Sequence, residues 1–84
     1  MTLQHELAGL IGSEMPSNGA QLLSFGMNNP ISATVLCMRD AQYHPYVVWT
    51  AYHDASSGAL VTEHGGYFAT MPEAMENYSA RGGS

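Results

Sequence analysis

The chain has 84 residues and a formal net charge of −5, because its lysine and arginine residues number only two while seven residues are aspartate or glutamate. Both cations are arginines, Arg39 and Arg81, and two cations cannot build the surface that nucleic-acid-binding proteins use to hold phosphates. The composition therefore argues against direct binding to DNA or RNA and against P-loop or Schiff-base lysine chemistry. The acidic balance indicates either a basic partner or a role in solubility alone.

The length predicts a single domain over residues 1–84, in which residues 82–84 form a frayed tail. Cys37 is the one cysteine, so no intramolecular disulfide can form. The first ten residues lack the basic region and apolar core of a secretory signal, and no run approaches the ~20 apolar residues that a membrane helix needs. We therefore expect a cytoplasmic protein with no membrane contact.

The first predicted elements are a helix and two strands. Thr2 is placed to cap a helix whose leucine and isoleucine residues recur at helical spacing, and Gly12 stands where it should end. Residues 12–20 read as a loop, 21–26 as a strand and 31–40 as a second, alternating strand. The alternation predicts that one side of the second strand carries Ile31, Ala33, Val35 and Cys37, and the other Ser32, Thr34, Leu36 and Met38.

The remaining predicted elements are two strands and a helix. Residues 45–53 form the third strand, the DASSG sequence at 54–58 a turn, and residues 59–64 the fourth strand, which Gly65-Gly66 should bend or bulge. Thr70 and Glu73 form a capping box for the last helix, which should end at Gly82.

These elements predict an α+β fold, an antiparallel β-meander of three to four strands with a short helix at each end, both packed on one face. If the turn pairs His53 with Ala59, one face carries Val47, Trp49, Ala51, Ala59 and Val61, and the other Tyr46, Val48, Thr50, Tyr52, Leu60, Thr62 and His64. We expect Trp49 to anchor the helix-covered face, which leaves the tyrosine and threonine face uncovered. Alternatively, those tyrosines simply line a solvated sheet face.

The sequence gives little indication of a metal site, a catalytic dyad or a catalytic triad. The histidines show no metal-ligand spacing, and the pairing above puts His53 and His64 on opposite faces, so we expect no metal and no cofactor. Cys37 with His44 resembles a dyad, but a thiol in an apolar strand usually behaves as a buried hydrophobe. The row from His53 to Ser57 is better explained by a turn than by a catalytic triad. We expect that the chain is not an enzyme.

Residues 44–81, HPYVVWTAYHDASSGALVTEHGGYFATMPEAMENYSAR, are similar in style to small orphan proteins of bacteriophages and mobile elements. The shared features are an aromatic strand, a turn, a second strand ending in Gly-x-Tyr-Phe and a short acidic helix. In gross terms the chain resembles anti-CRISPR proteins, which are short and acidic and which occupy a surface of a nucleic-acid-handling effector complex. The resemblance implies a function class and a bacterial host cell, and it transfers no functional residue.

The leading hypothesis is a small acidic, non-enzymatic inhibitor that blocks a basic, nucleic-acid-binding surface of a larger protein or ribonucleoprotein complex. The alternative is a structural or assembly protein that forms a homodimer through the exposed tyrosine and threonine face. The candidate partner-binding residues are the aromatic anchors Tyr46, Tyr52 and Tyr67 and the charged residues Asp54, Glu63, Glu73 and Glu76.

Overall fold

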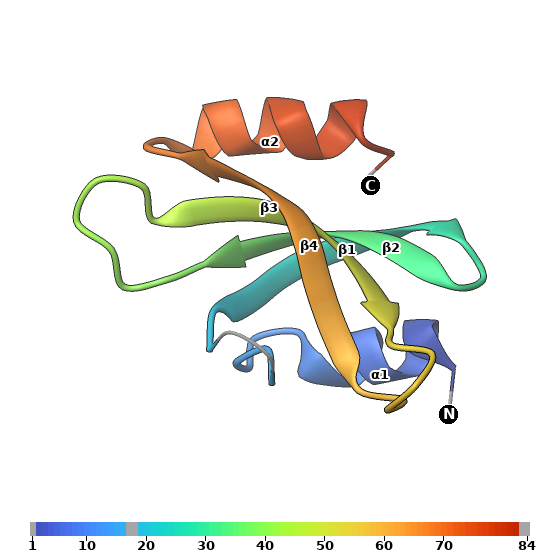
Figure 1. The fold of residues 1–84 in the computed structure, drawn as a ribbon. Coiled ribbons are helices and arrows are strands. Elements are labelled where there is room, and N and C mark those ends of the chain that lie inside the picture. Colours follow the sequence, from blue (N-terminus) through green and yellow to red (C-terminus); the bar gives the residue numbers. More distant parts are fainter. Residues whose placement is uncertain (1, 17–18, 83–84) are drawn as a thin grey trace.

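The structure is a computed structural model that describes residues 2–16 and 19–82. Within these residues, four strands form one antiparallel sheet in the order β1-β2-β3-β4 (Figure 1). The elements in chain order are α1 (Leu3–Leu10), β1 (Gln21–Asn29), β2 (Ser32–Met38), β3 (Tyr46–His53), β4 (Leu60–Phe68) and α2 (Met71–Ala80). The predicted α+β meander with a helix at each end is confirmed. The predicted frayed tail at 82–84 lies outside the described residues except for Gly82.

The ends of α1 follow from local chemistry. The Thr2 hydroxyl accepts a hydrogen bond from the His5 backbone N–H at 3.2 Å, which satisfies one of the donors that the first helical turn leaves unpaired. The chain then leaves the helix through Gly12, whose φ of +83° lies in the region that glycine adopts without strain. Neither helix of the described chain is long and apolar enough to span a membrane.

The ends of α2 follow the same logic. The Thr70 hydroxyl oxygen accepts from the Glu73 N–H at 3.4 Å and donates to Glu73 Oε1 at 2.8 Å, which confirms the predicted cap. The helix ends at Ala80, Arg81 is its C-cap, and the next residue, Gly82, has a φ of +100°.

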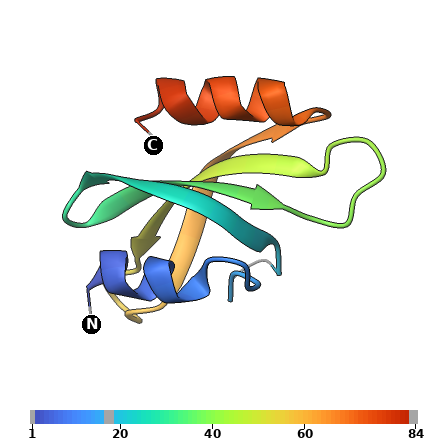
Figure 2. The same cartoon turned by 180° about the vertical axis from the view of Figure 1, so that it is seen from behind.

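The two helices lie on opposite faces of the sheet, so the prediction that both pack on one face is wrong (Figures 1 and 2). Leu7 of α1 joins a core that contains Trp49, while Tyr78 of α2 joins a separate core with Leu36 and Val48. The physical reason is that β2 and β3 are apolar on both sides. Residues 33–37 are all buried, and such a continuous buried run is typical of a strand that is covered on both faces.

Trp49 takes the position expected for it, in the core beneath a helix, with only 8% of its surface exposed. The β3–β4 pairing differs from the expected one by a single residue, because His53 pairs with Leu60 rather than with Ala59. The turn explains the shift: Asp54, one residue beyond His53, donates its backbone N–H to the Ala59 carbonyl at 2.8 Å. A one-residue shift exchanges the faces of β4 up to Glu63, so Leu60 lies in the core with Trp49 and Val61 lies opposite Tyr52.

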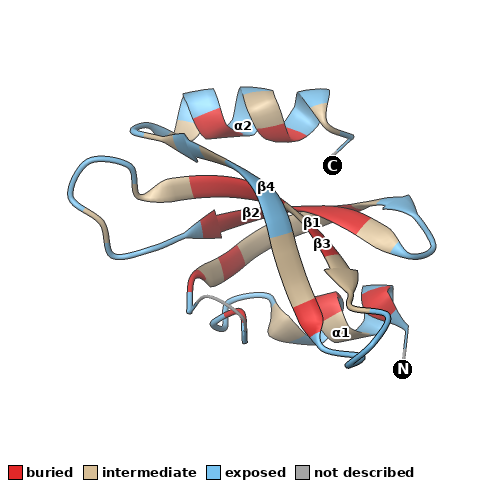
Figure 3. Cartoon of the chain, in the orientation of Figure 1, coloured by how far each residue is buried: buried red, intermediate tan, exposed pale blue. Residues whose placement is uncertain are grey.

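The predicted irregularity at Gly65-Gly66 is a β-bulge. Trp49 faces two residues of β4, His64 and Gly65, between the pairs Val48–Gly66 and Thr50–Glu63. His64 adopts a φ of 57°, as the first residue of such a bulge can. The bulge turns the middle of β4 outward, and residues 63–65 are exposed (Figure 3).

Candidate functional site

Helix α2 covers one half of the tyrosine and threonine face. Val48 is fully buried beneath it, and Tyr46 and Phe68 are partly buried against the same cluster. The expectation that this face is uncovered is therefore wrong for the half that contains Tyr46. This tyrosine packs within the chain itself.

The other half of the same face lies beyond α2. Here Tyr52 stands between Ser32 and Val61, and Thr50 stands beside Glu63 in the next row of the sheet. These rows border a shallow hollow that no residue of either helix lines in the described part of the chain. The hollow is lined by Asn29, Ile31, Ser32, Thr50, Tyr52, His53 and Glu63. We call these seven residues the open sheet end.

Tyr52 and Glu63 form the polar centre of the open sheet end. The Tyr52 hydroxyl donates a hydrogen bond to Glu63 Oε2 at 3.2 Å. This bond, with burial and the negative charges of Glu63 and Asp54, raises the pKa of Tyr52 above its ordinary value. The phenol therefore remains a neutral donor. The other carboxylate oxygen of Glu63 lies 3.2 Å from His64 Nε2.

Ile31 is a residue of the open sheet end whose position the sequence pattern predicted wrongly. It was expected inside the second strand, on the side that carries Ala33 and Val35, but β2 begins at Ser32 and Ile31 is 77% exposed. The Asn29 side chain accepts a hydrogen bond from the Ile31 N–H at 2.9 Å, which holds the residue at the tip of the hairpin. The preceding Asn-Asn-Pro sequence was the signal that this position belongs to a turn rather than to a strand.

Asp54 lies at the same end of β3 as Tyr52 and organises the β3–β4 turn. Its Oδ2 atom accepts from Ser56 Oγ at 2.7 Å, from Ser57 Oγ at 2.9 Å and from the Ser57 N–H at 3.0 Å. These bonds, that from Ser56 Oγ first, lower the pKa of the Asp54 carboxyl.

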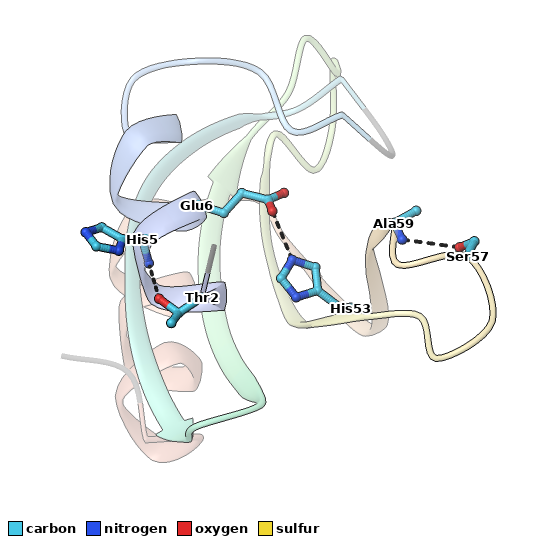
Figure 4. Close-up of polar contacts among 6 residues, drawn as sticks. All are labelled: Thr2, His5, Glu6, His53, Ser57 and Ala59. Atoms are coloured by element: carbon cyan, nitrogen blue, oxygen red, sulfur yellow. Dashed lines mark hydrogen bonds and ion pairs between the residues drawn. The ribbon is translucent and has the colours of Figure 1, made fainter.

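His53 borders the open sheet end, but its imidazole reaches the opposite face of the sheet, where it ties β3 to α1. Its Nε2 atom lies 2.9 Å from Glu6 Oε1, and Figure 4 shows this contact together with the bond from the Ala59 N–H to Ser57 Oγ. The row of residues from His53 to Ser57 is therefore divided between a helix contact and a turn. It does not converge on one point as a catalytic triad does.

The other predicted partner-binding residues lie apart from the open sheet end. Tyr67 is on the Trp49 face, where the two rings meet edge to face with centroids 6.3 Å apart and Arg39 Cζ lies 4.7 Å above the Tyr67 ring. Glu73 belongs to the cap of α2, and Glu76 is exposed on the same helix. The seven predicted residues thus do not form one surface, and the structure brings together Tyr52 and Glu63.

Cys37 and His44, which the sequence offered as a possible dyad, lie in different surroundings. Cys37 is buried in the core, and burial raises the pKa of its thiol to about 12, so the nucleophilic thiolate is not populated near neutral pH. His44, the partner considered for it, lies exposed in the β2–β3 loop. Among residues 2–16 and 19–82, no three histidine, cysteine, aspartate or glutamate side chains gather in a way that could hold a metal ion.

No protein family model matches this chain, and neither a curated protein nor a solved structure is similar to it.

Proposed function

We propose that this chain is a non-enzymatic binding protein that docks on a basic surface of a larger partner through the open sheet end. The observation that carries the proposal is the Tyr52–Glu63 pair, which lies beside the exposed Ile31 on a part of the sheet that neither helix covers. Tyrosine supplies large contact area at low entropic cost, and a neighbouring carboxylate adds recognition of a cation.

The charge of the whole molecule supports the same proposal. A net charge of −5 on a small domain attracts a basic surface over a distance of about one Debye length, roughly 10 Å at moderate salt. Such attraction accelerates association, while the final affinity depends on the contacts made at close range. The association rate should therefore fall as salt is added.

The finer proposal is inhibition of a nucleic-acid-binding complex, in the manner of anti-CRISPR proteins. A basic groove that holds phosphates also attracts carboxylates, so an acidic domain seated in the groove would exclude the nucleic acid. Seven carboxylates are sparse compared with one phosphate per ~1.7 Å of duplex, so local obstruction fits this chain better than imitation of DNA.

The test is affinity capture from cells of the host, with two pairs of matched variants. Tyr52→Ala and Glu63→Gln change the open sheet end. Tyr43→Ala removes a tyrosine that is exposed in the β2–β3 loop, and Asp40→Asn removes one negative charge from the same loop.

We expect a basic protein or ribonucleoprotein that is retained by the wild type and by both loop variants, and that is lost from Tyr52→Ala and Glu63→Gln. Addition of DNA or RNA should release the partner if the inhibitor proposal is right. Equal retention by all five proteins would refute docking through the open sheet end.

A further inference from the structure

The Glu63 carboxylate has capacity for a further hydrogen-bond donor. A carboxylate presents about four lone-pair positions, of which the Tyr52 hydroxyl occupies one on Oε2. The side chain is 49% exposed, so a donor that arrives from outside can reach it. The contact with His64 Nε2 at the other oxygen is an ion pair only when that imidazole is protonated.

The surroundings of this carboxylate favour a cation. Neither arginine of the chain is among the residues that line the hollow in the described structure. Asp54 adds to the negative potential at this end, since its charge contributes to the raised pKa of Tyr52. The polar lining residues Asn29, Ser32 and Thr50 supply neutral oxygens, which can accept further N–H bonds.

The apolar groups in the hollow distinguish between the two basic side chains. Tyr52 and Ile31 are both among the residues that line the hollow together with Glu63. A guanidinium group is planar and weakly hydrated, stacks on aromatic rings and donates two parallel hydrogen bonds to a carboxylate, whereas an ammonium group is a compact and strongly hydrated charge. The methylene stem of an arginine can also cover an exposed apolar side chain such as Ile31.

We propose that the open sheet end is an arginine receptor, in which an arginine side chain of the partner binds the Glu63 carboxylate and packs on Tyr52 and Ile31. This inference rests on the proposed function and adds to it the chemical identity of the group that is recognised. Basic surfaces rich in lysine alone should bind more weakly.

The experiment is a titration of the isotopically labelled protein with a short polyarginine peptide and with a polylysine peptide of the same length, followed by backbone amide NMR. We expect the arginine peptide to shift the amides of residues 50–52 and 61–63 and to bind roughly tenfold more tightly than the lysine peptide. Glu63→Gln should weaken arginine binding by about tenfold, while Asp40→Asn, which makes the same change in net charge, should alter it by less than about twofold. Tyr52→Phe should keep the preference for arginine, and Tyr52→Leu should lose it.

The outcomes separate this inference from the function on which it rests. Equal affinity of the two peptides, with shifts in the open sheet end, would overturn the arginine receptor and leave a general docking site for cations. Shifts that are confined to other parts of the chain, for either peptide, would overturn both the receptor and the docking site.

Discussion

Gly65 shows how a single residue can hold the sheet in its bulged form. A Cβ atom built at this position would lie 2.5 Å from Trp49 Nε1 and 2.9 Å from Trp49 Cδ1, which is closer than carbon atoms approach other side chains. The indole therefore packs directly on the backbone of β4. Since Trp49 belongs to the core beneath α1, the bulge and that core depend on each other.

Gly65→Ala should destabilise the protein by about 1–3 kcal/mol, because the added methyl group forces the indole out of its packed position. The free energy of unfolding is measured by urea denaturation, and near-UV circular dichroism reports on the environment of Trp49. Gly9→Ala is the matched control, since a Cβ atom at that exposed helical position meets nothing within 4 Å. The control should be neutral or stabilising by up to about 1 kcal/mol, and equal losses in the two variants would contradict the packing described for Trp49.

Asp54 gives a prediction about acid stability. Its pKa is lowered from 3.8 in the folded chain by the bonds from Ser56 and Ser57, so the unfolded chain binds this proton more readily. The stabilisation is therefore complete above pH 3.8 and is lost as the pH falls through the lower folded pKa. The difference in unfolding free energy between wild type and Asp54→Asn should narrow with acidification in that range. A difference that stays constant with pH, when measured by denaturation at each pH, would show that the carboxylate has no such role.

At the scale of the elements, the features that depend on residues close together in the sequence were predictable. The caps at Thr2 and Thr70, the break at Gly12 and the bulge at Gly65-Gly66 each follow from bonds or backbone angles within a few residues. The face on which α2 packs was not predictable from such patterns. Leu36 and Val48 offer one apolar surface and Trp49 another, so a short helix can be accommodated on either side.

The candidate site was only partly predictable for the same reason. Tyr52 and Glu63 were both identified, but their contact depends on a register that a single residue in the turn decides. The sequence could not tell which of Tyr46, Tyr52 and Tyr67 lies in the open sheet end, because all three are tyrosines near strand ends. What separates them is the placement of α2 over Tyr46 and of Tyr67 beside Trp49.

The Arg81 side chain joins the end of α2 to the bulge in β4 through hydrogen bonds. Its Nη1 atom donates to the His64 carbonyl at 2.7 Å and lies 3.5 Å from the Val48 carbonyl, while its own carbonyl accepts from the Thr34 hydroxyl at 3.2 Å. The bond to His64 pairs a charged donor with the carbonyl of a residue in the bulge. This contact helps to hold α2 over one half of the face.

Arg81→Ala should cost about 1–3 kcal/mol of unfolding free energy and should loosen α2. Hydrogen exchange at the Tyr78 amide measures the loosening, and urea denaturation measures the stability. Met75→Ala on the exposed side of the same helix is the control, with an expected change within about 0.5 kcal/mol. If Arg81→Ala behaved like this control, α2 would be held by its apolar contacts alone.

At the scale of the whole molecule, one helix on each face leaves little of the sheet for a second copy of the chain. Two chains of charge −5 also repel each other as they approach. Under the proposed function, this repulsion disfavours self-association, for which the open sheet end is the surface that a homodimer would use.

We expect a monomer at low micromolar concentration, at both low and moderate salt, by sedimentation or light scattering. Tyr52→Ala should leave this state unchanged. A dimer in the wild type that dissociates in Tyr52→Ala would instead support the assembly protein considered from the sequence.

The most direct test of the docking proposal is site-specific photo-crosslinking in host cells, with the photoreactive analogue p-benzoylphenylalanine at position 52 or at position 43. Both positions hold tyrosines, but only Tyr52 lies in the open sheet end, while Tyr43 is exposed in the β2–β3 loop. We predict a discrete adduct with a basic protein from position 52 that disappears when Glu63→Gln is added, and no such adduct from position 43. The same adduct from both positions, or from position 43 alone, would contradict the assignment of the open sheet end as the docking surface.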